Sequence, residues 1–150
     1  MTLHILLDSS PLGLLSQPAR GTAAPLAHWP AACLAAGHEI YVPEVIDYEL
    51  RRGLLRAGKV NGVRELDRLK SALNFLPITS AAMLLAADLR ATSRQGGLPT
   101  GDPKKLDIGV IPAAQALTLG VPAADFVVAT SNAGHLSRFM PAGLWSNVKP

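Results

Sequence analysis

Short apolar runs alternate with longer segments of helical character along this sequence. Each apolar run ends in polar or turn-forming residues, which is typical of a buried β-strand. The strands predicted in this way are residues 3–7, 39–42, 75–78 and 124–129. Strands that alternate with helices in a chain of this size predict an α/β fold, with a central, mainly parallel sheet sandwiched between helices.

The segments between these strands predict five helices. Their expected positions are residues 24–36, 43–55, 63–73, 81–93 and 110–119. Pro43 suits a first helical turn, and Thr79 or Ser80 suits the cap that precedes a helix. The pair Asn61-Gly62 predicts a turn, and the sequence Asp-Ser-Ser-Pro after the first strand is interpreted as a turn as well.

The composition indicates one globular domain that spans residues 1–150. The chain is 49% hydrophobic and 17% charged. Its one cysteine, Cys33, is expected in the core and excludes both a disulfide scaffold and a cysteine-ligated zinc site. Asp8 interrupts the apolar stretch near the start, and no apolar run reaches the ~20 residues that span a bilayer. We therefore expect a cytoplasmic protein without a membrane segment.

Carboxylates are the strongest candidates for chemistry, because the sequence lacks P-loop, dinucleotide-binding, zinc-protease and serine-hydrolase motifs. The acids expected to converge are Asp8, Glu49, Asp102 and Asp107. Asp8 follows the first strand, and Glu49 lies on the apolar stripe of its predicted helix. Parallel sheets place their chemistry at the carboxyl ends of strands, where Thr130 also falls. Clustered acids repel each other unless a cation neutralises them, and oxygen ligands favour Mg²⁺ or Mn²⁺.

Positive charge is concentrated behind an acidic first third of the chain. The basic residues are Arg51, Arg52, Arg56, Lys59, Arg64, Arg68 and Lys70. They are interpreted either as the solvated faces of a helical hairpin or as a surface for a polyanion. Sequence-specific base stacking is not expected, because Phe75, Phe126 and Phe139 lie in or beside predicted core strands, and RNA recognition should depend on backbone charge and RNA shape.

Five stretches of the sequence resemble, in the same order, those of the PIN domains, and within them the VapC-type toxin ribonucleases of prokaryotic toxin–antitoxin systems. They are HILLDSS (4–10), VPEVIDYELRRGLL (42–55), LPITSAAMLLAADLRA (76–91), GDPKKLDIGVIPAAQAL (101–117) and FVVATSNAGHLSRF (126–139). Together they span most of the chain. The resemblance implies a single PIN-like α/β/α domain.

The resemblance also implies roles for individual residues. Asp8 matches the first metal-binding acid of the family, and Ser9 occupies a polar position after it. Glu49 matches the second acid. Thr130 and Asn132 match the step that carries the fourth site position, where this chain has an amide in place of a charge.

The third acidic position is where the sequence departs from the family. An acid normally stands four residues before an Ala-Ala pair, and that position is Gly109 here. Asp107 lies two residues earlier, which on a regular helix is about 200° away. Because proline is tolerated only in the first turn of a helix, Pro112 suggests that the helix begins near Gly109. We therefore hypothesise that residues 107–109 are extended and let Asp107 replace the missing acid; Asp107 acting only as a helix cap is the alternative.

The function implied by the resemblance is that of a metal-dependent endoribonuclease, the toxin of a type II toxin–antitoxin pair. Asp8, Glu49 and Asp107 would hold Mg²⁺ or Mn²⁺, and Asn132 with Ser9 or Thr130 would position the attacking water. The residues expected to contact the RNA backbone, or an acidic antitoxin segment, are Arg51, Arg52 and Arg56. A homodimer and an antitoxin partner are implied as well.

Two other functions have different requirements. A PIN-fold protein that has lost catalysis through Gly109 and Asn132 would act as an RNA- or protein-binding, regulatory module. A phosphatase of the haloacid-dehalogenase type needs a second Asp two residues after Asp8. Ser10 occupies that place, which counts strongly against this function.

Overall fold

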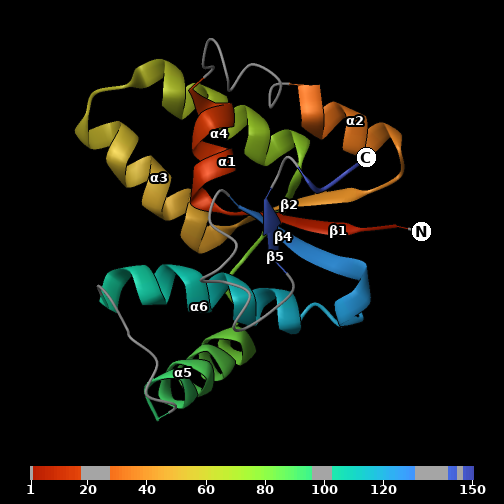
Figure 1. Ribbon diagram of the computed structural model, residues 1–150. Helices are drawn as coiled ribbons and strands as arrows, with labels where there is room; N and C mark the ends of the chain where they lie inside the picture. The colour runs from red at the N-terminus through yellow and green to blue at the C-terminus, as the bar shows by residue number, and fades with distance from the viewer. Residues whose placement is uncertain (1, 18–27, 96–102, 131–141, 145–146) are drawn as a thin grey trace.

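The computed structural model describes residues 2–17, 28–95, 103–130, 142–144 and 147–150, with backbone alone at 93–95, 103–109, 123, 142 and 144. In this part of the chain, five parallel strands form one sheet in the order β3-β2-β1-β4-β5 (Figure 1). They are β1 (His4–Leu7), β2 (Glu39–Pro43), β3 (Asn74–Leu76), β4 (Phe126–Thr130) and β5 (Ala142–Leu144). The predicted α/β fold with a parallel sheet is thereby confirmed.

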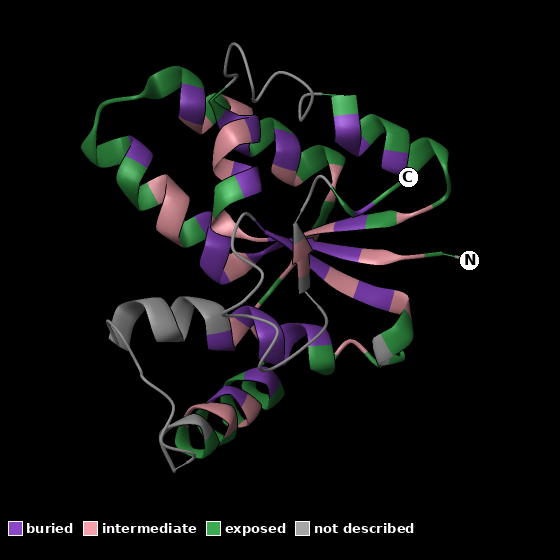
Figure 2. Ribbon diagram, viewed as in Figure 1, coloured by how far each residue is buried: buried purple, intermediate pink, exposed green. Residues whose placement is uncertain are grey.

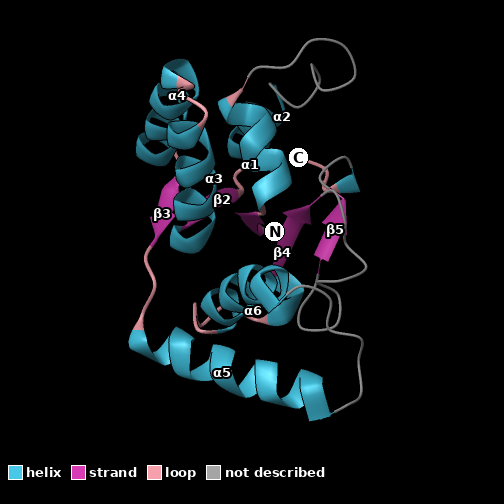
Figure 3. Cartoon of the chain, turned by 90° about the vertical axis from the view of Figure 1, so that its left-hand side faces the viewer, coloured by secondary structure: helices cyan, strands magenta, loops and turns pink. Residues whose placement is uncertain are grey.

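Helices cover both faces of the sheet (Figures 1 and 3). They are α1 (Ser9–Ser16), α2 (Trp29–Ala35), α3 (Glu44–Arg56), α4 (Val60–Ala72), α5 (Ser80–Gln95) and α6 (Pro103–Leu117). The first four lie on one face, whereas α6 lies against the other and α5 packs outside it. None of the helices in the described residues is long and apolar enough to cross a membrane.

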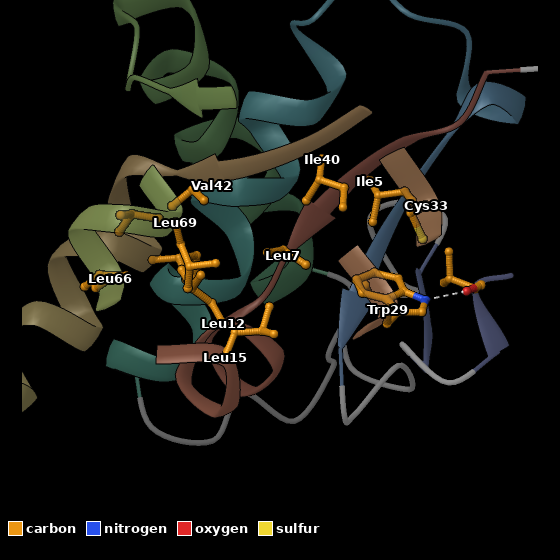
Figure 4. Close-up of a cluster of buried hydrophobic side chains, with 14 of the residues drawn as sticks. Ile5, Leu7, Leu12, Leu15, Trp29, Cys33, Ile40, Val42, Leu66 and Leu69 are labelled. Carbon is orange, nitrogen blue, oxygen red and sulfur yellow. Dashed lines mark hydrogen bonds between the residues drawn. The ribbon is translucent and has the colours of Figure 1, made fainter. Parts of the chain in front are cut away.

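The larger core lies between the sheet and the first four helices (Figure 4). Its members include Ile5, Leu7, Leu12, Leu15, Trp29, Cys33, Ile40, Val42, Leu66 and Leu69. Burial raises the pKa of the Cys33 thiol, which lies in this core as expected. Alternate residues of the central strands therefore face this layer, and their neighbours face the other. Figure 2 shows that most residues of the central strands are buried, because helices cover both faces of the sheet.

The second core layer depends on small side chains. Ala113 and Ala116 of α6 pack against Leu6, Phe126 and Val128 of the sheet. On the other side of α6, Val110 and Ala114 pack against Ala82 and Ala86 of α5. Because these alanines are short, the backbone of α6 approaches both the sheet and α5 closely.

Two predicted turns are helical in the structure. Asp-Ser-Ser-Pro begins α1, because the Asp8 side chain accepts a hydrogen bond from the Ser9 amide and caps the helix. Asn61-Gly62 was also predicted to be a turn, but it lies in the first turn of helix α4. The chain reverses direction at Gly58 instead, where φ is +68°. Gly62 is glycine for a packing reason, since a Cβ there would lie 2.8 Å from Leu54 Cδ2.

Strand β3 is shorter than predicted and begins one residue earlier. Residues 77–78 leave the sheet, and the Ile78 amide donates to Glu44 Oε1 at 2.8 Å instead of to a neighbouring strand. Thr79 caps α5 as expected, with its hydroxyl accepting from the Ala82 amide. Pro43 ends β2 and precedes α3 instead of occupying its first turn. The predicted helix at 24–36 is described from Trp29 onward.

Candidate active site

Asp8 and Thr130 meet at the carboxyl ends of two neighbouring strands. β1 and β4 pair in parallel up to Leu7 and Ala129, so the residues that follow are adjacent. The Asp8 amide donates to the Ala129 carbonyl at 3.0 Å, and Thr130 Oγ1 donates to Asp8 Oδ2 at 2.7 Å. Thr130 is only 1% exposed. The structure thus brings together two of the residues that the sequence analysis placed at this edge.

The carboxylate of Asp8 is held from two sides. Oδ1 accepts from the Ser9 amide at 2.8 Å, while Oδ2 accepts from Thr130. Asp8 and Ser9 are half-buried, and Ser10 is exposed. Each carboxylate oxygen has a second acceptor direction, so these two hydrogen bonds orient the group and still leave it able to bind a cation.

Glu49 is less buried than the sequence pattern predicted. Ile46 and Leu54 of α3 are buried, whereas the Glu49 side chain is 36% exposed and lies at the margin of that face. Its Oε2 accepts from the Arg52 guanidinium at 3.1 Å. The prediction that Glu49 faces the core is therefore wrong, because an arginine one turn away holds its charge at the surface.

Asp47 is the buried acid of α3, and it was not among the predicted site residues. It is 6% exposed and accepts from Arg51 at 2.9 and 3.3 Å, with Lys70 Nζ 4.0 Å away. Arg51 also contacts Asp67 of α4 at 2.8 Å. Hydrogen bonding to Asp47 is the main reason why the pKa of Arg51 is raised. The i,i+4 spacing of Asp47 and Arg51 is the sequence signal for this pair.

The three arginines predicted to contact RNA have different surroundings. Arg51 is held between α3 and α4 by two carboxylates, while Arg52 and Arg56 are exposed. The Arg52 guanidinium carbon also lies 6.0 Å from the centroid of the Tyr48 ring. Tyr48 is 60% exposed, and it was not among the residues predicted to contact RNA.

The third acidic position lies on helical backbone. α6 begins at Pro103 and continues past Pro112, so the prediction that residues 107–109 are extended is wrong. A proline inside a helix removes one hydrogen bond, and α6 tolerates that loss because the following residues pack tightly on both sides. By helical spacing, position 109 shares the row of Ala113 and Ala116, which faces the sheet.

Position 107 shares a different row of α6, that of Val110 and Ala114, which pack on α5. The side chain of Asp107 lies outside the described part of the structure, as do the whole of Asp102, Ser131, Asn132 and His135. Over the residues that are described, no three acidic, histidine or cysteine side chains form a group able to hold a metal ion. Mg²⁺ and Mn²⁺ prefer oxygen ligands, so the carboxylates of Asp8 and Glu49 are of the right chemical type to bind either ion.

No protein-family model matches the sequence, and no curated protein matches it significantly. Solved structures, however, match almost the whole chain. One is a chain of VapBC2 from Rickettsia felis, solved bound to a DNA fragment from the promoter, with a TM-score of 0.70 and 17% identity over 95% of this chain and 99% of that one.

Two further structures give the same result. A chain of VapBC-1 from nontypeable Haemophilus influenzae has a TM-score of 0.67 and 18% identity, covering 97% of this chain and 100% of that one. A chain of FitAcB from Neisseria gonorrhoeae has a TM-score of 0.66 and 18% identity, covering 96% and 99%. The PIN-like α/β/α fold expected from the sequence is confirmed by these likenesses.

Proposed function

We propose that this protein is a metal-dependent endoribonuclease and the toxin of a type II toxin–antitoxin pair. The observation that carries the proposal is the hydrogen bond of 2.7 Å from Thr130 to Asp8, which fixes a carboxylate at the sheet edge where parallel folds place their chemistry. The full-length likeness to chains of VapBC and FitAcB complexes supports the same class.

In this proposal Asp8 and Glu49 are the ligands of Mg²⁺ or Mn²⁺, and the titration described below decides whether Asp107 is a third. Such an ion lowers the pKa of a bound water and stabilises the charge that develops on a phosphodiester. Thr130 and the Ser9 amide keep the Asp8 carboxylate oriented, because both donate to it. Asn132 and the Ser9 hydroxyl are assigned to hold the attacking water.

Arg52 has a second consequence for this site. Its guanidinium occupies Glu49 Oε2, so a cation must compete with an arginine for this proposed ligand. We assign contacts with the RNA backbone to Arg52 and Arg56, which are exposed. Arg51 is committed to Asp47 and Asp67 and does not have that role.

The partners proposed are RNA as substrate, a small antitoxin protein and a second copy of the chain, all in the cytoplasm. The matching chains were solved as parts of VapBC structures. The exposed arginines of α3 would suit an acidic antitoxin segment as well as RNA, because both are negatively charged.

A catalytically degenerate PIN-fold protein, acting as an RNA- or protein-binding module, is the second candidate. The helical backbone at position 107 favours it, because that position shares the row of α6 that packs on α5. Without a third acid the site would hold a divalent cation weakly.

Calorimetric titration of Mn²⁺ into the metal-free protein separates these two functions. We expect Asp8→Asn and Glu49→Gln to abolish binding, and Glu65→Gln, which alters an acid paired with Arg68 on α4, to leave it unchanged. Loss of binding in Asp107→Asn would establish the third ligand. Absence of binding in the unaltered chain at millimolar Mn²⁺, with no cleavage of a single-stranded RNA, would favour the degenerate module.

A further inference from the structure

The outer face of α3 carries an unusual set of exposed side chains. They are Tyr48, Arg52, Leu55 and Arg56, with Lys59 in the turn that follows, and we call them the α3 stripe. Tyr48 and Leu55 are 60% and 63% exposed. The four helical members are spaced i, i+4, i+7 and i+8, so they share one side of the helix. The stripe therefore combines a bare aromatic ring with three cations.

The positive charge of the stripe is only partly balanced. Arg56 and Lys59 form no ion pair with any residue in the described part of the chain, and no acid lies within the stripe. The bases next to it differ, since Arg51 pairs with Asp47 and Asp67 and Arg68 pairs with Glu65. Arg56 and Lys59 therefore have no carboxylate partner among the described residues, unlike Arg51 and Arg68.

The stripe begins next to Glu49, one of the proposed metal ligands. Tyr48 precedes Glu49 in the chain, and Arg52 contacts both, lying 3.1 Å from Glu49 Oε2 and 6.0 Å from the Tyr48 ring centroid. From Tyr48 to Arg56 the helix rises about 12 Å at about 1.5 Å per residue. The α3–α4 hairpin projects away from the sheet, so its turn lies at the left edge of Figure 1.

We infer that the α3 stripe binds single-stranded RNA on its way to the active site, with an unpaired base stacked on Tyr48 and phosphates held by Arg56 and Lys59. This inference rests on the proposed nuclease function and names the form of its substrate. An exposed aromatic ring in a row of cations is the combination with which proteins bind single strands. Stacking on one exposed ring tolerates any base, so it is compatible with the expectation that sequence-specific stacking is absent.

The stacking part of the inference is tested by binding without cleavage. Fluorescence anisotropy of a labelled 12-nucleotide single-stranded RNA, in EDTA, would be measured for Tyr48→Ala, Tyr48→Phe and the control Leu84→Ala, which alters a residue 72% exposed on α5. We expect Tyr48→Ala to weaken binding roughly 5- to 100-fold, because one stacked base contributes about that much. Tyr48→Phe and Leu84→Ala should bind as the unaltered protein does.

Double-stranded RNA and poly-L-glutamate are the control ligands for this binding experiment. Neither offers an unpaired base, so Tyr48→Ala should leave the affinity for both unchanged. An equal loss for poly-L-glutamate and single-stranded RNA would show that Tyr48 belongs to a protein-binding surface and would overturn the inference. Unchanged affinity of Tyr48→Ala for the single strand would overturn it too.

The phosphate contacts are tested by salt. Arg56→Gln combined with Lys59→Gln should reduce the slope of log K against log salt by about 1.4, since each cation contributes about 0.7 on a single strand. An unchanged slope would remove these residues from the binding surface. Binding that depends on Tyr48, together with no RNA cleavage in Mn²⁺, would refute the nuclease function and leave the stripe intact.

Discussion

Thr130 is the residue whose side chain most directly organises the candidate site. It is buried, it is the last residue of β4, and its hydroxyl donates to the acid that follows the neighbouring strand β1. Asp8 in turn has two structural tasks, because it also caps α1. At the residue scale, site geometry and folding stability therefore depend on the same carboxylate, and a change at Thr130 should affect both.

Thr130→Val, which removes the hydroxyl and keeps the shape, should lower the free energy of unfolding by about 1.5–3 kcal/mol, the usual value of a hydrogen bond to a charged group. Urea denaturation measures this. Thr118→Val is the control, because Thr118 directly follows α6, is exposed and donates only to carbonyls of that helix, so removing its hydroxyl should cost below about 0.5 kcal/mol. Equal effects of the two changes would contradict the role given to Thr130.

Tyr41, which lies opposite Leu6 on the neighbouring strand β2, should show a pH effect. Burial, and then a hydrogen bond from its hydroxyl to Glu39 at 2.8 Å, raise the pKa of Tyr41 from 10.0 to about 12. Because the folded value is the higher one, the stabilisation is fully present below pH 10 and is lost as the pH rises to about 12. Phenolate absorbance should therefore include one late-titrating tyrosine, and Glu39→Gln should bring that titration to lower pH.

At the scale of elements, the α3–α4 hairpin shows how local chemistry sets a turn. Gly58 has a left-handed backbone with open space around it, and it lies between two helices of 13 residues each. Gly53, in the middle of α3, also has open space but an ordinary helical conformation. The two glycines therefore differ in backbone conformation alone.

Alanine substitutions at these glycines should have opposite effects. Gly58→Ala should destabilise the protein by about 1–2 kcal/mol, because the left-handed conformation is unfavourable for a residue with a Cβ. Gly53→Ala should stabilise it by about 0.5–1 kcal/mol, since alanine loses less conformational freedom in a helix. Urea denaturation of both variants gives the signs, and two changes of the same sign would refute this account.

The element boundaries that were predicted wrongly share a physical cause. Asp-Ser-Ser-Pro and Asn61-Gly62 have side chains that suit either a turn or the start of a helix, and only packing decides between them. Pro112 was expected to mark a helix start, yet the buried alanines around it hold the helix together. Strong apolar runs such as β1 and β4, in contrast, were predictable because burial leaves them no alternative.

At the scale of the whole molecule, the local sequence patterns did not predict the order of the strands in the sheet. Only the family resemblance implied it. Local patterns placed Asp8 and Thr130 each at the end of a strand. That the two strands are neighbours follows from tertiary structure, with β1 in the middle of the sheet between β2 and β4. The contact of Arg51 with Asp67 likewise depends on tertiary structure, because it joins α3 to α4. The pairs Asp47–Arg51 and Glu49–Arg52, in contrast, have helical spacings that the sequence shows.

The pairing of β1 with β4 also determines when the candidate site can form during synthesis of the chain. Asp8 and Thr130 are separated by 122 positions, and a ribosome adds about 5–20 residues per second, so roughly 6–24 s pass between the making of one and the other. Until β4 emerges, β1 has an open edge and Asp8 lacks its threonine. A nascent chain therefore cannot assemble this site early, and whatever activity the site has begins only near the completion of the domain.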